Sequence, residues 1–416
     1  MGWAQPGCYG GKLAPTPNID RIAAEGVRFT DGYVSACVCS PSRVGLLTGR
    51  YQARSGHDAN TEGREVERKA LAPGEITFGQ RMKAAGYVTG IVGKWHVGMA
   101  APEQWPSARG FDESFGSRGN LDEPTGFFYR GSGRVPAPEG APITSPIFAR
   151  EAVAFIERHR TRPWFLYLAF NAVHSPVVAS APVMRRFAHL PPREQAYAAL
   201  LSEADDAIGT VMARLRELSL EENTLVFCLS DNGGASPLAD QGGLRGRKWL
   251  LFEGGIRVSW LAQWRGRIPA GRVLATPVIQ LDLLPTALAA AGVEVRSDWQ
   301  LDGVNLLPLL EGRAAGLDRD ALYWRFGTQY AVREGEWKLV RPGRDEPVML
   351  FNLARDRGER EDLAARHPER VAALQTRWDR WNATMPPPRW EDPRWHDGTT
   401  ANAARRAKTR KSATKN

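Results

Sequence analysis

One stretch of this 416-residue chain reads Cys39-Ser40-Pro41-Ser42-Arg43-Val44-Gly45-Leu46-Leu47-Thr48-Gly49-Arg50 and predicts a short helix. Ser40 suits the N-cap, Pro41 the first helical position, and Gly49 the C-terminal stop. Cys39 then lies just before a helix N-terminus, where unpaired N–H groups and the helix dipole favour an anion. Arg43, one turn further on, can offer its planar fork of donors to the same anion. Taken alone, the stretch is also compatible with a capped helix that carries an inert, half-buried thiol.

Two further segments place basic side chains after predicted strands. In Gly93-Lys94-Trp95-His96-Val97-Gly98, Lys94 and His96 are two residues apart and share a face if the chain is extended. Both can then reach one anion, although such a pair is also common on a solvated rim. His174 follows the apolar run 165–170, and there it is compatible with an ordinary loop residue.

Polar residues also follow the apolar run 225–229. Asp231 and Asn232 come directly after it, and ligand sites of open α/β sheets lie beyond the carboxyl ends of strands. Taken alone, the Asp-Asn-Gly sequence is equally compatible with an ordinary Asx turn. Lys248 precedes the turn sequence Glu253-Gly254-Gly255, and alone it indicates no more than a solvated loop.

Apolar runs alternate with amphipathic segments along most of the chain, which predicts an α/β architecture. The spacing of apolar residues predicts helices over 18–27, 80–87, 194–218 and 280–291, and strands over 88–93, 165–170 and 225–229. The two later runs are of the kind found in buried parallel strands. Beyond about residue 312 the pattern changes to short alternating segments, 329–333 and 337–340, followed by a helix over 369–382. We therefore expect a small antiparallel sheet and a closing helix after the larger part.

The bulk composition, 43% hydrophobic and 24% charged residues, is typical of a globular protein, and no apolar run approaches the length of a membrane span. The cysteines Cys8, Cys37, Cys39 and Cys228 are too few for a disulfide scaffold. Cys37 and Cys39 have no companion Cys/His pair at metal-ligand spacing.

The net charge of +9 is concentrated in the C-terminal tail, since six basic residues after Asp397 leave +3 for the rest of the chain. That tail contains almost no apolar bulk and no aromatic residues between its charges, so a solvated, disordered tail is predicted rather than a nucleic-acid-binding arm.

Together these segments resemble, in content and order, the formylglycine-dependent (type I) sulfatases of the alkaline-phosphatase superfamily. The Cys39 stretch matches the signature in which a cysteine followed by x-Pro-x-Arg is oxidised to an aldehyde. The segments at Lys94, His174, Asp231 and Lys248 match further family motifs, and the match extends from about Cys8 to the closing helix.

The resemblance implies a large alkaline-phosphatase-like domain over 1–312, with a mixed, mostly parallel sheet flanked by helices. It also implies a C-terminal α+β subdomain over 313–385 with an antiparallel sheet, before a tail over 386–416.

The resemblance implies hydrolysis of an aryl or carbohydrate sulfate monoester. The hydrated formylglycine at position 39 would attack sulfur beside one Ca²⁺, held by Asp231, Asn232 and residue 39 itself. Arg43, Lys94 and Lys248 would bind the sulfuryl oxygens, and Lys248 or His174 would protonate the leaving alcohol. His96 would act as the base that releases sulfate. The implied partners are a sulfated small molecule or glycan and a formylglycine-generating maturation enzyme, and the oligomeric state stays open.

This sequence departs from the family pattern in two places. Trp249 and Leu250 replace the usual small residues after Lys248, which predicts a reshaped pocket rim. In the family, an apolar strand ending in two aspartates completes the calcium site, and it precedes a segment that resembles residues 1–10. Asp231 and Asn232 alone are too few ligands for Ca²⁺. We therefore expect that strand upstream of Met1, with any signal peptide.

With a signal peptide we expect a periplasmic or extracellular protein, and without one a cytoplasmic protein. Two alternatives remain: a phosphonate or phosphate monoester hydrolase of the same superfamily, and a catalytically inactive protein that binds sulfate or glycans. The segment 116–136 contains residues suited to a substrate loop, but its sequence does not identify the substrate.

Overall fold

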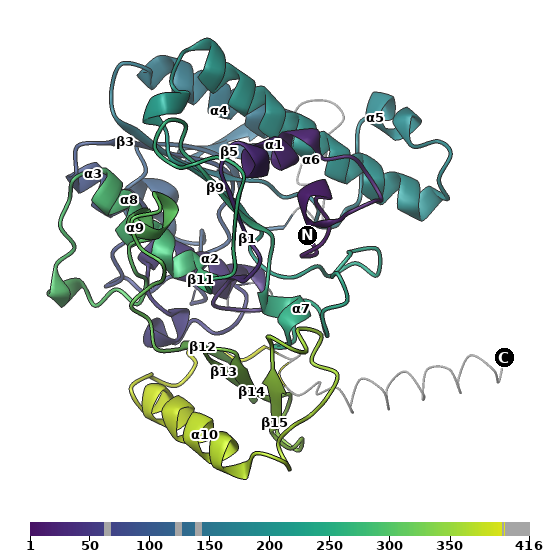
Figure 1. Ribbon diagram of the computed structural model, residues 1–416. Helices are drawn as coiled ribbons and strands as arrows, with labels where there is room; N and C mark the ends of the chain where they lie inside the picture. Colours follow the sequence, from purple (N-terminus) through teal and green to yellow (C-terminus); the bar gives the residue numbers. More distant parts are fainter. Residues whose placement is uncertain (62–67, 121–126, 138–143, 393–394, 396–416) are drawn as a thin grey trace.

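The computed structural model describes residues 1–61, 68–120, 127–137, 144–392 and 395, which form an α/β body and a small C-terminal sheet (Figure 1). Within these residues, no helix combines the length and apolar character that crossing a bilayer requires. The basic end of the predicted tail lies outside the described residues. The first part of the tail is described: Trp395 is buried beside Phe326, and Arg389 N donates to Gly56 O.

One half of the body contains a five-stranded sheet in the order β6-β5-β4-β3-β7. Its strands are β3 (Val88–Lys94), β4 (Glu113–Ser117), β5 (Phe127–Arg130), β6 (Gly133–Pro136) and β7 (Trp164–Ala169). Strand β3 pairs in parallel with both β4 and β7, whereas β5 and β6 form an antiparallel hairpin at the edge. The predicted strands over 88–93 and 165–170 are thus confirmed.

Helices cover both faces of this sheet, because the buried strand β3 is apolar on both sides. Ile91 packs toward Leu47 of α2 (Cys39–Thr48), while Val92 packs toward Phe148 of α4 (Ser145–His159). The long helix α6 (Pro192–Glu217) lies beside α4 on the outer face. Such a helix–sheet–helix arrangement is what the alternating pattern of the sequence predicts.

The other half of the body contains a four-stranded sheet in the order β10-β1-β9-β8. Its strands are β1 (Val27–Phe29), β8 (Val226–Leu229), β9 (Trp260–Gln263) and β10 (Arg272–Leu274). Strand β1 is parallel to β10, but β9 is antiparallel to both β1 and β8. A further pair, β2 (Gly32–Tyr33) and β11 (Val278–Ile279), is parallel. The mixed character of the fold is therefore confirmed. The expectation of a parallel partner for 225–229 is wrong, because among the described residues β8 pairs only with the antiparallel strand β9.

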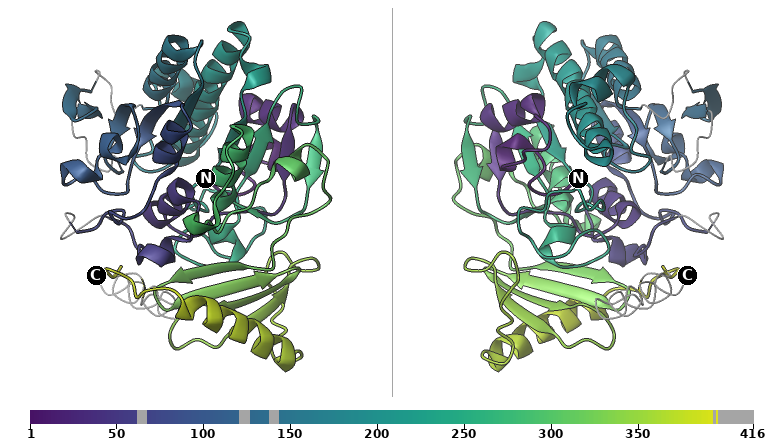
Figure 2. Two further views of the ribbon diagram at one scale, coloured as in Figure 1. Left: turned by 90° about the vertical axis from the view of Figure 1, so that its left-hand side faces the viewer. Right: turned by 90° about the vertical axis from the view of Figure 1, so that its right-hand side faces the viewer.

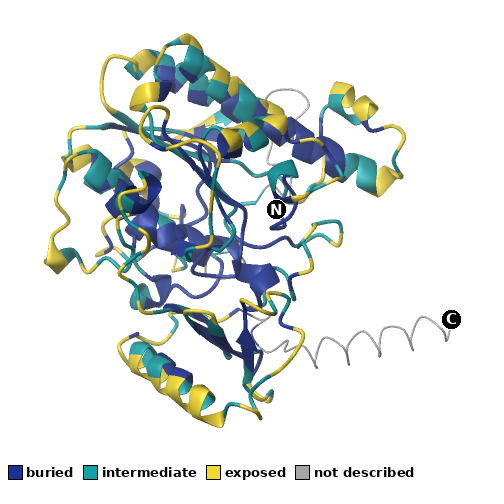
Figure 3. Ribbon diagram, in the orientation of Figure 1, coloured by how far each residue is buried: buried dark blue, intermediate teal, exposed yellow. Residues whose placement is uncertain are grey.

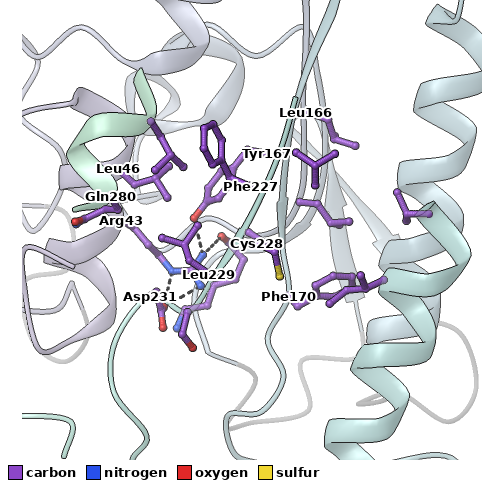
Figure 4. A pocket seen from close by; sticks show the side chains of 18 of the residues that line it. Arg43, Leu46, Leu166, Tyr167, Phe170, Phe227, Cys228, Leu229, Asp231 and Gln280 are labelled. Atoms are coloured by element: carbon purple, nitrogen blue, oxygen red, sulfur yellow. Dashed lines mark hydrogen bonds and ion pairs between the residues drawn. The ribbon is translucent and has the colours of Figure 1, made fainter. Parts of the chain in front are cut away.

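A cavity of about 840 Å³ separates β7 of the first sheet from β8 of the second (Figure 4). Its walls are mostly apolar and include Leu166, Phe227 and Leu229. Among the described residues, β7 pairs only with β3 and β8 only with β9. Most residues of both strands are only half-buried as a result.

The remaining helices are α1 (Pro17–Ala24), α3 (Phe78–Ala84), α5 (Ala181–Arg186), α7 (Glu253–Ile256), α8 (Leu283–Ala290), α9 (Leu307–Leu310) and α10 (Pro368–Ala383). Of these, α1, α3, α8 and α10 correspond to the expected segments, whereas no helix was expected at α5, α7 or α9. Single 3-10 turns lie at Gly7–Tyr9, Gln52–Ser55, Pro102–Gln104, Pro106–Arg109, Glu221–Asn223, Gln280–Asp282 and Ser297–Trp299. The predicted helix over 280–291 is thus a 3-10 turn that leads into α8.

The C-terminal sheet is antiparallel in the order β12-β13-β14-β15, as expected (Figure 2). Its strands are β12 (Leu322–Phe326), β13 (Gln329–Glu334), β14 (Trp337–Arg341) and β15 (Met349–Asn352). Helix α10 covers one face through Leu374 and Trp378, and the other face packs on the body through Trp324 and Phe351. The domain boundary at residue 312 stays a prediction.

Buried charges cross the junction between this sheet and the body. Lys338 Nζ donates to Glu253 Oε1 at 2.8 Å and to Glu359 Oε1 at 2.9 Å, and the side chains of all three are fully buried. Arg333 of β13 forms an ion pair with Asp31 of the body. Figure 3 shows how far the buried residues extend through the body and into this junction.

Candidate active site

The N-terminus of α2 lies at the centre of the candidate site. The helix begins at Cys39 itself, with Val38 as its N-cap, so the prediction of Ser40 as N-cap is wrong. The physical reason is that the Ser40 hydroxyl instead contacts His57 Nε2 at 2.7 Å. Pro41 is the third helical residue, where its missing N–H still removes no helical hydrogen bond. Gly49 ends the helix in the left-handed conformation (φ 65°), as predicted.

Buried polar contacts fix this turn in place. The Gln280 side chain accepts from Ser35 N at 2.8 Å and donates to Ser42 O at 3.1 Å. Asn60 Oδ1 accepts from Ser40 N at 3.0 Å. Because each contact reaches the backbone from another part of the chain, the first turn of α2 is held against several segments at once.

Arg43 connects the helix to both sheets (Figure 4). Its Nε and Nη2 atoms each lie 3.0 Å from Asp231 Oδ2, and its Nη1 donates to Lys94 O at 2.7 Å and to Tyr167 Oη at 3.2 Å. The guanidinium is therefore oriented by groups at the ends of β3 and β8 and by a side chain of β7. Only a planar fork of donors can make these contacts together.

Lys94 and His96 approach the same position from the end of β3. Lys94 Nζ donates to Asn120 Oδ1, and the His96 ring is close enough to the Cys39 thiol to lower its pKa. His96 has a φ of 60°, so the chain here is not extended and the predicted shared face does not explain the convergence. The bond from His96 N to Arg118 O, at 2.7 Å, holds this conformation instead.

The charges around Cys39 favour an anion at its side chain. The thiol is 2% exposed, and burial raises its pKa, as does Asp231. Lys94, Lys248 and His96 outweigh both effects and lower the pKa of Cys39 to about 5. A thiolate is therefore the stable form at neutral pH, and another small anionic group at this position would be stabilised in the same way.

Asp231 and Asn232 follow β8 and offer oxygen atoms to a cation. Burial raises the pKa of Asp231, but Arg43, Lys94 and Lys248 lower it well below the usual range, so the carboxylate is charged. Asn232 is 4% exposed, and its Oδ1 is buried without a hydrogen-bond partner among the described residues. Such an orphaned oxygen fits a hard metal ion, which prefers carboxylate and amide oxygens. The described residues contain no cluster of three or more His, Cys, Asp or Glu for a metal, so these two donors form only part of a site.

His174 and Lys248 complete the set of predicted residues. Lys248 is 4% exposed, and its charge acts on Cys39, Lys94 and Asp231. His174 is half-buried, and its Nδ1 lies 2.8 Å from Ser175 O. Burial lowers the pKa of His174, and the neighbouring Lys248 lowers it further. His174 is thus a neutral group beside a buried ammonium, an arrangement suited to proton exchange.

The structure brings all the predicted residues to one end of the cavity, which is lined by Cys39, Arg43, Lys94, His174, Asp231, Asn232 and Lys248. His96 joins them through Cys39. Sequence reasoning missed Tyr167, Asn120 and Gln280. Tyr167 lies in a predicted strand and is the only polar side chain between Phe165 and Phe170. That exception in an apolar run could have indicated a role at the site. Asn120 and Gln280 carry no comparable signal.

The family model described as Sulfatase matches residues 1–293, and the one described as N-sulphoglucosamine sulphohydrolase, C-terminal, matches residues 246–379. The chain is 36% identical to N-acetylgalactosamine-6-sulfatase of Homo sapiens, over 90% of this chain and 81% of that protein.

Among solved structures, Ps i-CgsB in complex with k-i-k-neocarrahexaose has a TM-score of 0.87 and 29% identity, covering 94% of this chain and 92% of that one. The phosphonate monoester hydrolase SpPMH of Silicibacter pomeroyi has a TM-score of 0.70 at 19% identity, over 92% and 94% of the two chains. At that identity, the second match shows the fold alone.

Proposed function

This chain belongs to the sulfatase family, whose reaction is the hydrolysis of sulfate monoesters, and we propose that its substrate is a carbohydrate sulfate and its nucleophile derives from Cys39. One observation carries the proposal. Three cationic side chains, Arg43, Lys94 and Lys248, surround the buried residue 39 at a helix N-terminus and stabilise negative charge there. A sulfuryl group carries its charge on oxygens, which suits this cluster.

The sulfatase family uses a formylglycine and a metal ion in general. We propose that Cys39 is the residue converted to formylglycine, and that a formylglycine-generating enzyme is the partner that converts it. Asp231 and Asn232 Oδ1, together with residue 39, would hold the metal, which we propose to be Ca²⁺ because both side chains offer oxygen donors. When the metal is bound, it and the hydrated formylglycine together supply a nucleophilic hydroxyl of lowered pKa.

The other side chains bind the ester and move protons. Arg43, Lys94 and Lys248 bind the sulfuryl oxygens and stabilise the charge that grows on them. The leaving alcohol takes its proton from Lys248 or from His174, which lies beside it. His96, whose ring acts on the pKa of residue 39, accepts the proton whose loss releases sulfate.

We further propose that the remaining metal ligands lie on a strand that fills the cavity between β7 and β8. The cavity supports this because its walls are mostly apolar and its polar end is at Asp231, and because each flanking strand is paired on one side only among the described residues. The coding sequence upstream of Met1 tests this point. An in-frame apolar segment ending in two aspartates supports it, and a signal peptide preceding that segment would support export.

Two comparisons support a carbohydrate substrate. The human relative is named for a sulfated sugar, and the structural neighbour Ps i-CgsB was solved with an oligosaccharide. Trp249, which replaces a small residue of the family pattern, lines the cavity beside Lys248 and offers an aromatic surface at its rim. Aromatic faces commonly pack against sugar rings, so Trp249 is consistent with this choice.

The proposal is tested on protein coexpressed with a formylglycine-generating enzyme. Mass spectrometry of the peptide between Arg28 and Arg43 should show the aldehyde at position 39, and the protein should hydrolyse sulfated N-acetylgalactosamine or a sulfated oligosaccharide. Matched aryl sulfate and aryl phosphate esters form the control. Faster hydrolysis of the phosphate would favour the phosphonate or phosphate hydrolase, and sulfate binding without turnover would favour an inactive binding protein.

A further inference from the structure

Lys248 lies on a loop that the C-terminal sheet holds in place. The loop runs from Arg245 to Glu253, and Glu359 contacts both of its ends. Arg245 Nη1 donates to Glu359 O at 3.0 Å, and Glu253 N donates to Glu359 Oε2 at 2.7 Å. The position of Lys248 therefore depends on residues that follow it by about a hundred positions in the sequence.

The centre of this loop is in a conformation that needs support. Trp249, directly after Lys248, has a φ of 76°, which is uncommon for a residue with a bulky side chain and costs about 1 kcal/mol or more. Its N–H donates to Cys37 O at 3.1 Å, two residues before Cys39. Lys248 N–H donates to Gly234 O at 3.2 Å. These bonds use the N–H groups of Lys248 and Trp249 and fix the loop against the site. The carbonyl oxygen of Trp249 needs a different partner.

One amide side chain of the C-terminal sheet supplies that partner. Gln329, the first residue of β13, donates from Nε2 to Trp249 O at 3.0 Å and accepts at Oε1 from Leu251 N at 3.3 Å. It is 2% exposed, so both contacts are shielded from water. A primary amide is the side chain that can donate to one peptide group and accept from another at the same time.

We propose that Gln329 is a positioning residue for Lys248, through which the C-terminal sheet sets the geometry of the sulfate site. The inference rests on the proposed function, since it takes Lys248 as the group that contacts the sulfuryl and leaving oxygens. Gln329 itself does not touch the ester. It holds the turn at Trp249 so that the buried Lys248 stays in the cavity that residue 39 also lines.

The test is a double-mutant cycle between Gln329→Ala and Lys248→Ala on the matured protein. With aryl sulfates of increasing leaving-group pKa, Gln329→Ala should lower kcat/KM by about tenfold for the poorest leaving group and less for the best. In the Lys248→Ala background, the same substitution should change kcat/KM by less than about twofold. Gln329→Glu keeps the acceptor for Leu251 and loses the donor to Trp249, so it provides a second variant if Gln329→Ala fails to fold.

Gln375→Ala is the matched control. This amide lies on α10 and bonds the hydroxyl of Tyr330, the neighbour of Gln329 in β13, without contacting the loop of Lys248. It should leave both kcat/KM and its dependence on the leaving group unchanged. Additive effects of Gln329→Ala and Lys248→Ala, or an equal loss for every leaving group, would overturn the proposal.

Binding of inorganic sulfate is measured by calorimetry on the same variants. It distinguishes a failure of the proposed function from a failure of the positioning role of Gln329. Gln329→Ala should weaken sulfate binding in the presence of Lys248 and not in its absence. If the protein binds sulfate with this coupling but hydrolyses no ester, the proposed function fails and the positioning role stands. If it hydrolyses esters without any coupling, the positioning role fails and the proposed function stands.

Discussion

Replacing Arg43 with lysine should impair hydrolysis strongly while keeping the positive charge. Arg43 contacts Asp231 through two nitrogens and also donates to Lys94 O and Tyr167 Oη. A lysine ammonium cannot span these partners, so at least two charge-assisted hydrogen bonds are lost. At about 1.5 kcal/mol for each, the loss is about 3 kcal/mol. If transition-state stabilisation falls by that amount, kcat/KM falls about 150-fold.

The assay compares kcat/KM for one sulfate ester between the wild type and Arg43→Lys, with folding checked by the midpoint of urea unfolding. The matched control is Arg325→Lys, because Arg325 is about as buried as Arg43 and forms a double contact with Asp58, in the junction with the C-terminal sheet. That variant should lose stability and keep kcat/KM. A kcat/KM of Arg43→Lys within about threefold of the wild type, in folded protein, would refute the reasoning.

Three further outcomes follow from the site. Burial, with Arg389 nearby, lowers the pKa of His57 to about 3. The unfolded chain therefore binds more protons below about pH 6.5, and stability falls as the pH drops from there toward 3, by about 2 kcal/mol at pH 5. His57→Gln should flatten this part of the curve of unfolding free energy against pH, and an unchanged acid limb would contradict the assignment. Asn232→Ala should reduce metal retention after dialysis at least about tenfold, measured by elemental analysis, since it removes the orphaned oxygen; unchanged retention would exclude Asn232 as a ligand. Cys39→Ala should abolish turnover and retain binding of inorganic sulfate, because Arg43 remains; residual turnover at the wild-type rate would exclude residue 39 as the nucleophile.

Much of the fold could be predicted because its signals are local. The apolar spacing in α6 and the stop at Gly49 depend on residues within a few turns, and the structure confirms both. The antiparallel pair β13 and β14 was also visible as alternation. The direction of β8 relative to its neighbour could not be predicted, because β8 pairs with β9, whose residues lie more than thirty positions away in the sequence.

The site residues could be predicted from sequence motifs. The contacts that hold those residues in place could be predicted only in part. The Ser40 hydroxyl is used by His57, a residue whose proximity depends on the fold, so local capping preference failed there. His96 reaches Cys39 through a left-handed backbone, which strand periodicity does not anticipate. Gln280 and Asn120 act through contacts across long sequence separations, and such partners have no pattern of their own.

The charges buried at the junction of the C-terminal sheet have a consequence for how the molecule unfolds. Separating the C-terminal sheet from the body would break the buried pair of Lys338 with Glu253 and the pair of Arg333 with Asp31, which both cross the junction. Breaking such a pair by removing one partner typically costs about 3–5 kcal/mol. Partial unfolding of the C-terminal part alone is therefore disfavoured, and the chain should lose its structure in one cooperative transition rather than in two.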